Sequence, residues 1–160
     1  MIDMMIEARP KDLGGFTVGR ILPFAKRRMV GPFVFLDHMG PAEFAPGFEG
    51  LNVRPHPHIG LSTVTYLFEG RARHYDRLGS ALTILPGEVN WMPAGRGIVH
   101  SERTDAPVRA AGLRMHGMQA WVGLPIENED DPPAFAHYGP EDMPTYSEGG
   151  LHARLIAGNA

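Results

Sequence analysis

Glycine and proline, spread between short apolar runs, constrain this chain more than any other feature. The sequence holds 20 glycines and 15 prolines in 160 residues, more than a fifth of the chain. Short β-branched and aromatic runs that end at glycine or proline are typical of strands and turns. The pattern therefore predicts an ordered all-β domain, with no convincing helix and no βαβ alternation.

The expected strands follow one another at short intervals. Runs with strand character cover residues 16–22, 32–38, 61–69, 71–76, 81–85, 89–92, 98–102, 113–124 and 151–157. Residues 40–50, rich in glycine, proline and phenylalanine, are expected to form a loop. Short strands at this spacing predict a sandwich or a barrel.

The chain length suits one domain, but its last part differs in composition. Residues 127–150 contain seven acidic residues and four prolines and no lysine or arginine. Such a segment is typical of a surface loop or linker rather than a core element. We therefore expect a barrel over residues 1–126, followed by an acidic, proline-rich loop and a final strand over residues 127–160.

Composition excludes several functional classes. The sequence has no cysteine, so disulfides and thiolate metal sites are excluded, and a metal would need imidazole and carboxylate ligands. A net charge of −3 and a pI near 6.2 offer no basis for direct nucleic-acid binding. The sequence shows no signal-peptide core and no apolar stretch near the roughly 20 residues of a membrane helix, so the expected location is the cytoplasm.

Two pairs of residues, each with one residue between its members, have the pattern of metal ligands. His56 and His58 would share one face of a strand, and His100 and Glu102 would do the same on another. If the two strands face each other inside a barrel, three nitrogens and one oxygen converge and leave coordination positions open. An open site is typical of catalysis rather than of structural metal binding.

The glycines around these histidines carry a family resemblance. Gly50-x₅-His56-x-His58-x₁₁-Gly70 resembles the first cupin motif, and Gly87-x₅-Pro93-x-Gly95-x₄-His100 resembles the second. More narrowly, the segments HPHIGLSTVTYLFEG, WMPAGRGIVHSE, QAWVGLP and PFVFLDHMGP resemble the pirin family.

This resemblance implies a cupin-type double-stranded β-helix, a jelly-roll barrel, that holds one divalent metal ion on His56, His58, His100 and Glu102. Cupins usually carry a glutamate ligand soon after the second histidine, where this chain has Ser62 and Thr63. In the pirin pattern the carboxylate follows the last histidine by two residues, and Glu102 fills that place. Fe(II) is the ion implied, while Zn, Ni, Mn and Cu(II) also suit the donors.

Pirins resemble two packed cupin domains, and the chain has residues for the first alone. The face that a second domain would cover is expected to be apolar and to favour self-association.

The resemblance implies a dioxygenase that opens flavonols of the quercetin type. Two roles for Glu102 stay open: it remains a metal ligand, or it leaves the ion and acts as general base for the substrate hydroxyl. An alternative is a non-enzymatic, metal- or redox-dependent regulator that binds transcription factors or other protein partners. A third is a domain that holds metal without a closed pocket. The residues alone do not separate these functions.

Two further side chains have open roles. His74 lies on an alternating strand, where it is either a residue that orients a metal ligand or a histidine satisfied in the core or at the surface. Trp121, within the QAWVGLP segment, is expected in the core.

Overall fold

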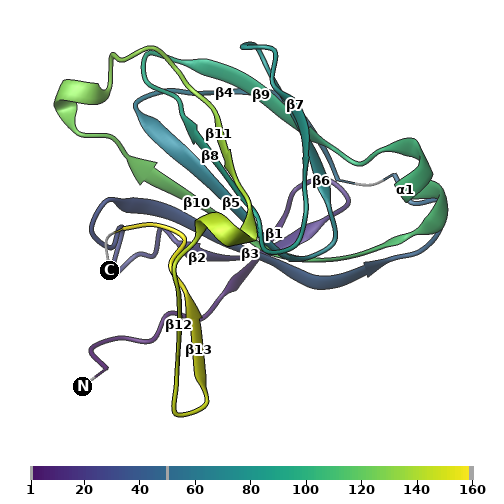
Figure 1. Ribbon diagram of the computed structural model, residues 1–160, viewed down its shortest axis with the longest axis horizontal. Coiled ribbons are helices and arrows are strands. Elements are labelled where there is room, and N and C mark those ends of the chain that lie inside the picture. The colour runs from purple at the N-terminus through teal and green to yellow at the C-terminus, as the bar shows by residue number, and fades with distance from the viewer. Residues whose placement is uncertain (1, 50, 159–160) are drawn as a thin grey trace.

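Two antiparallel sheets pack face to face and form a barrel (Figure 1). The computed structural model describes residues 2–49 and 51–158. Gly50, which begins the first cupin-like motif, lies outside the described residues. All pairings between neighbouring strands are antiparallel in the described part of the chain, as expected for a barrel without βαβ units.

The larger sheet has seven strands among the described residues. In spatial order they are β1 (Arg9–Asp12), β2 (Thr17–Leu22), β3 (Phe33–Phe44), β10 (Leu113–Gly123), β5 (Leu61–Glu69), β8 (Val89–Pro93) and β11 (Ala136–Tyr138). The smaller sheet consists of β4 (Asn52–His58), β9 (Ile98–Arg103), β6 (Ala72–Asp76) and β7 (Ala81–Ile84). The hairpin of β12 (Thr145–Glu148) and β13 (Leu151–Arg154) extends away from the barrel (Figure 1). The prediction of an all-β barrel is confirmed.

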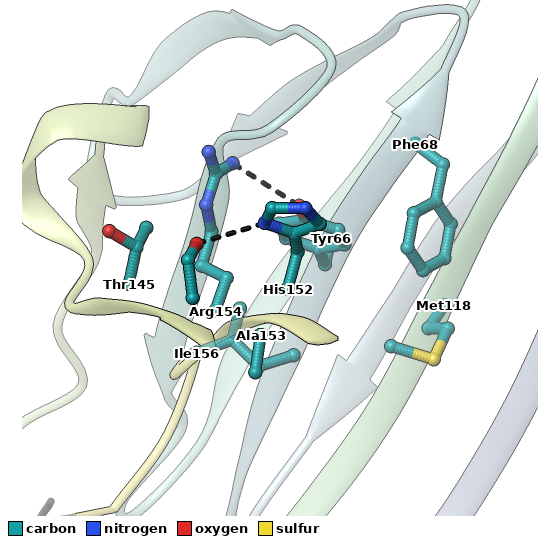
Figure 2. A pocket seen from close by; sticks show the side chains of 9 residues that line it. Tyr66, Phe68, Met118, Thr145, His152, Ala153, Arg154 and Ile156 are labelled. Carbon is teal, nitrogen blue, oxygen red and sulfur yellow. Dashed lines mark hydrogen bonds between the residues drawn. The ribbon is translucent and has the colours of Figure 1, made fainter. Parts of the chain in front are cut away.

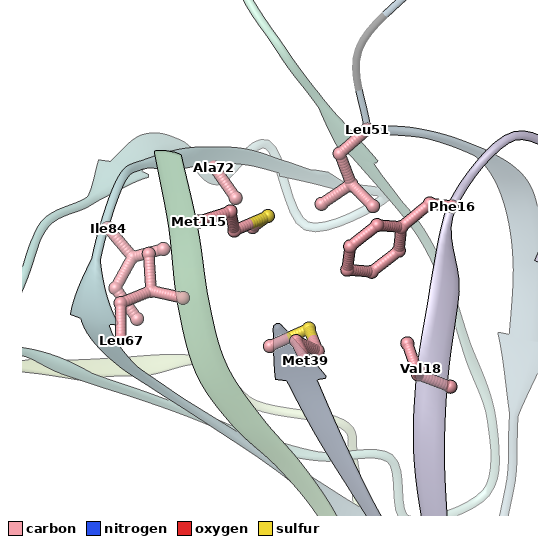
Figure 3. Packing of buried hydrophobic residues seen from close by; sticks show 8 residues of the cluster. All are labelled: Phe16, Val18, Met39, Leu51, Leu67, Ala72, Ile84 and Met115. Carbon is pink, nitrogen blue, oxygen red and sulfur yellow. The ribbon is translucent and has the colours of Figure 1, made fainter. Parts of the chain in front are cut away.

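Apolar side chains from both sheets meet between them (Figure 3). The buried cluster consists of Phe16, Val18, Met39, Leu51, Leu67, Ala72, Ile84 and Met115. Alternation along β5 explains which of its residues take part, because every second side chain points inward. Leu67 faces this core, whereas Val64 belongs to a second cluster with Val89 and Ala120.

The expectation of no helix is wrong for one short segment. Helix α1 (Ala106–Ala111) links β9 to β10, and two 3₁₀ helices, η1 (Ile126–Asn128) and η2 (Pro140–Asp142), lie further along the chain. None of the α1 residues is buried. Six residues without a buried face leave no apolar periodicity for sequence reasoning to detect. None of these helices has the length and hydrophobicity that crossing a membrane requires, within the described residues.

Strand β3 extends into the segment expected to be a loop. It continues to Phe44, and Ala42 pairs with Met115 of β10. Gly40 has a φ of +74° and lies where the register between the two strands is irregular. A glycine with positive φ often marks a turn. Here the positive φ of Gly40 allows β3 to continue as a strand through the irregular pairing with β10.

The acidic segment of residues 127–150 is mostly exposed, but two parts of it join the barrel. Met143 is buried and packs with the cluster of Val64, Val89 and Ala120. Strand β11 pairs with β8 and extends the larger sheet. Met143 is an isolated apolar residue among many acidic ones, so no apolar pattern in the sequence predicts its burial. The final strand is also shorter than expected and ends at Arg154.

Leu67 provides a test of the core between the sheets. Its side chain is fully buried, so Leu67→Ala is expected to lower the free energy of unfolding by about 2–5 kcal/mol. Leu78→Ala, in the turn after β6, is the control because Leu78 is 47% exposed, and its cost should be about 0.5 kcal/mol or less. Chemical denaturation followed by circular dichroism measures both. Equal losses would contradict this assignment of the core.

Candidate metal centre

The pairing of β4 with β9 brings the two histidine motifs together. The strands are antiparallel, and His56 lies directly opposite His100. His56 and His58 are two residues apart, so both side chains point to the same side of β4. Pro57 between them donates no backbone hydrogen bond, which is tolerated because β4 is an edge strand. The local sequence therefore places three imidazoles on one side of the smaller sheet.

The three histidines converge through the same ring nitrogen. The Nε2 atom of His100 lies 3.0 Å from Nε2 of His58 and 3.1 Å from Nε2 of His56. One nitrogen from each ring falls in a group whose members all lie within 4.8 Å of one another. Such a cluster of imidazole nitrogens is the arrangement that divalent transition metals bind.

Hydrogen bonds on the far side of the rings indicate which nitrogens carry protons. His56 Nδ1 lies 2.9 Å from the carbonyl oxygen of Arg54, and only a protonated Nδ1 can donate to that oxygen. The Nε2 atom of neutral His56 therefore presents a lone pair to the cluster. The Nε2 atom of His100 is 3.1 Å away, and lone pairs on two nitrogens at that distance repel each other unless a proton or a cation lies between them. This is the arrangement expected of metal ligands.

Burial keeps two of the rings neutral. Burial, followed by the charge of His56, lowers the pKa of His58 to about 4. Burial, followed by the charges of the neighbouring histidines, lowers the pKa of His100 to about 3. Both imidazoles are therefore uncharged at neutral pH, which is the form that binds a metal.

Glu102, expected as the fourth ligand, lies beside the three histidines but outside their group. Its Oε1 atom is 3.8 Å from Nδ1 of His100. Its Oε2 atom is buried and accepts no hydrogen bond from the described residues. Burial raises the pKa of this carboxyl. A buried oxygen without a partner is costly, so the donor set of three nitrogens and this carboxylate fits a cation better than it fits the protein alone. Ligation by Glu102 stays a prediction.

His74 lies directly behind His100. It is buried, its ring stacks on Phe135 at 4.3 Å, and Nε2 donates to Oδ2 of Asp76 over 2.9 Å. This bond leaves a lone pair on His74 Nδ1, which is 3.5 Å from Nδ1 of His100. The contact favours a proton on His100 Nδ1 and turns its Nε2 lone pair toward the other histidines. His74 is thus a satisfied core residue that also contacts a candidate ligand.

A cavity of about 280 Å³ opens beside the histidines inside the barrel. It is lined by Leu13, Val18, Arg20, Phe35, Asp37, Met39, Val53, His56, His58, Glu102, Gln119 and Trp121. Phe35 and Trp121 stack at 4.0 Å with their planes 13° apart, and the Trp121 ring contacts the ring of His58 at 5.2 Å. Trp121, expected in the core, is therefore part of the cavity wall.

Sequence reasoning missed three polar residues of this wall. Arg20, Asp37 and Gln119 lie side by side on β2, β3 and β10, since Asp37 pairs with both of the others. Their positions in the sequence are far apart, and only the strand register brings them together. The available signals were that Gln119 belongs to the QAWVGLP segment and Asp37 to the PFVFLDHMGP segment.

A larger hollow, of about 580 Å³, lies outside the barrel (Figure 2). Tyr66, Phe68 and Met118 of the larger sheet face His152 and Arg154 of the hairpin across it. It contains none of the converging histidines. The smaller cavity is therefore the candidate site, because it combines candidate metal donors with an aromatic wall.

The barrel and its histidine group define a cupin-type protein with a site able to hold a metal ion. The sequence matches the family described as Pirin over residues 15–122, more than half of the chain. The chain therefore belongs to the pirin family, as the motifs predicted.

Three similar proteins illustrate the relationship. A pirin-like protein of Caulobacter vibrioides is 62% identical over 162 residues, covering 100% of this chain and 56% of the relative. A Pseudomonas aeruginosa protein provisionally named quercetin 2,3-dioxygenase is 47% identical, covering 96% of this chain and 47% of its own. A crystal structure of quercetin 2,3-dioxygenase from Acinetobacter baumannii is 41% identical with a TM-score of 0.87, over 96% of this chain and 49% of that one. The chain spans about half the length of these relatives.

The variant Gly95→Ala tests the turn before β9, the strand that positions His100. Its φ is +49°, and an added Cβ would lie 2.0 Å from the carbonyl oxygen of Asp131. Gly31→Ala is a matched control, because Gly31 has a φ of +53° and open space around it. Both variants carry the cost of a left-handed residue, about 1–2 kcal/mol. Gly95→Ala should lose a further 1–3 kcal/mol or so through the clash. Equal unfolding free energies in urea would contradict this close approach.

Proposed function

We propose that this protein is a metal-dependent dioxygenase that acts on flavonols of the quercetin type or on related enol or catechol substrates. The observation that carries the proposal is the convergence of three imidazole Nε2 atoms beside a cavity with an aromatic wall. The relatives named quercetin 2,3-dioxygenase support the substrate class.

His56, His58 and His100 would hold the metal, with Glu102 as a fourth donor. The set contains nitrogen and oxygen and no sulfur, which suits Fe(II) and also Zn, Ni, Mn or Cu(II). When bound, a redox-active ion such as Fe(II) supplies the Lewis acidity and the electron transfer that reactions with O₂ require. We favour Fe(II) because the proposed reaction consumes O₂.

The chain's own residues would bind and deprotonate the substrate. Phe35 and Trp121, which stack on each other, line the cavity with aromatic surface that a planar ring system would contact. Glu102 lines the same cavity and has a carboxylate oxygen without a hydrogen-bond donor among the described residues. A substrate hydroxyl placed there would donate to this carboxylate and lose its proton to it. Leu13, Val18 and Met39 make much of the remaining wall apolar and reduce the water that competes for these contacts.

Metal content is the first test of the ligands. Protein purified without an affinity tag should contain about one equivalent of metal by mass spectrometry, and His56→Ala/His58→Ala should lose it. His38→Ala/His116→Ala is the matched control, because this second histidine pair, with Nε2 atoms 2.8 Å apart, lies away from the cavity. Metal that survives removal of His56 and His58, or that is lost with His38 and His116, would contradict the proposed site.

Glu102→Gln tests the proton acceptor. Glutamine keeps the size of the side chain but is a poor base, so O₂-dependent consumption of quercetin by the iron-loaded protein should fall by about 10²–10⁴-fold. Metal content, measured in parallel, separates loss of the base from loss of a ligand. Glu69→Gln is the control, since Glu69 pairs with Arg114 at the surface. Full turnover by Glu102→Gln with its metal retained would refute the base role.

A further inference from the structure

An arginine–aspartate pair lies in the wall of the metal cavity. Arg20 donates from Nε to Oδ1 of Asp37 and from Nη2 to Oδ2, both over 2.8 Å. Asp37 is 5% exposed and the Arg20 side chain 24%, so the carboxylate is largely removed from water and the guanidinium partly so. A buried ion pair stabilises a fold little more than apolar residues of similar size would. Its presence beside the candidate metal centre therefore calls for a functional explanation.

The pair leaves part of the guanidinium available. Both hydrogen bonds to Asp37 use Nε and Nη2, and Nη1 lies outside the pair. The guanidinium carbon lies 4.4 Å from the centre of the Phe35 ring, which in turn stacks on Trp121. Two hydrogen bonds and one ring contact thus fix the position of Arg20, and little conformational entropy would be lost when it binds a ligand.

Two aromatic rings separate Arg20 from the nearest histidine of the cluster, because Arg20 lies over Phe35, Phe35 stacks on Trp121, and Trp121 contacts the ring of His58. Arg20, Asp37 and Gln119 are directly opposite one another on three neighbouring strands. Two strand spacings separate the first from the last, or about 10 Å. Gln119 and Glu102 line the same cavity. A planar molecule of two or three linked rings spans the length from Arg20 to Gln119 within the cavity that Glu102 also lines.

We propose that Arg20 is a specificity-determining residue of this cavity and that it selects planar aromatic substrates carrying an oxygen acceptor on the ring remote from the histidines. The inference rests on the proposed function and adds to it the feature by which the substrate is chosen. Asp37 is the positioning residue, because it holds the guanidinium flat against Phe35 and balances its charge.

The test compares two flavonols that share the hydroxy-ketone expected to face the histidines. Quercetin carries hydroxyl groups on its outer rings, whereas 3-hydroxyflavone carries none there. Binding is titrated without O₂ by the absorbance of the flavonol, on metal-loaded protein, so that the result does not depend on turnover. The parent is expected to bind quercetin at least about tenfold more tightly than 3-hydroxyflavone, since a hydrogen bond from a charged donor contributes about that factor.

Arg20→Gln/Asp37→Asn removes both charges together and leaves neither stranded in the barrel. This variant should lose the preference for quercetin while binding of 3-hydroxyflavone and metal content stay unchanged. Arg20→Lys keeps the charge and should lose most of the preference for quercetin. It tests the same inference if the double variant unfolds. Arg114→Gln/Glu69→Gln neutralises a comparable pair at the surface and should change neither affinity.

An unchanged preference in both Arg20 variants would overturn the inference, as would a parent that binds neither flavonol. A purely structural role for Arg20 would lower both affinities alike and would overturn it too. Failure of the proposed function gives a different result. In that case the parent binds quercetin with the Arg20-dependent preference but does not consume it in the presence of O₂.

Discussion

The antiparallel pairing of β4 with β9 is the constraint on which the rest of the site depends. It sets His56 opposite His100, and the two-residue spacing of His56 and His58 adds the third imidazole. A slip of one residue would turn every side chain of β4 to the other face and disperse the cluster. Because β4 is an edge strand, its register is defined by β9 alone within residues 2–49 and 51–158. The turn at Gly95, pressed against the Asp131 carbonyl, fixes where β9 begins.

The barrel interior is divided between stability and chemistry. The apolar cluster around Leu67 and Met115 fills one part of it, and three histidines and Glu102 lie beside that cluster. Buried imidazoles and a carboxylate oxygen without a partner oppose folding, because each loses its contacts with water. A fully apolar interior would be more stable but could bind no ion. Such departures from good packing are expected at functional sites, where the remaining core offsets their cost.

The sequence predicted the parts of this molecule that are encoded locally. Alternating apolar residues and terminating glycines located most strands, and the spacing of His56 and His58 located the cluster. Contacts that depend on register and belong to no ligand motif were not predicted: Arg20 and Asp37 are 17 residues apart and meet only because β2 pairs with β3. The same limit applies to Met143, whose burial depends on the sheet face it covers rather than on its acidic neighbours.

Charge balance connects the histidine cluster with the arginine in the opposite part of the wall. Arg20 and Asp37 neutralise each other, so the pair adds no net charge to the cavity. His58 and His100 are neutral through burial, which leaves Glu102 as the remaining carboxylate among the residues that line the cavity. A divalent ion held there would be offset by one negative charge alone. Buried charges in proteins are paired, and a singly deprotonated ligand such as an enolate would complete the balance. The cavity is thus suited to an acidic, planar ligand at one end and to a neutral, hydrogen-bonding contact at the other.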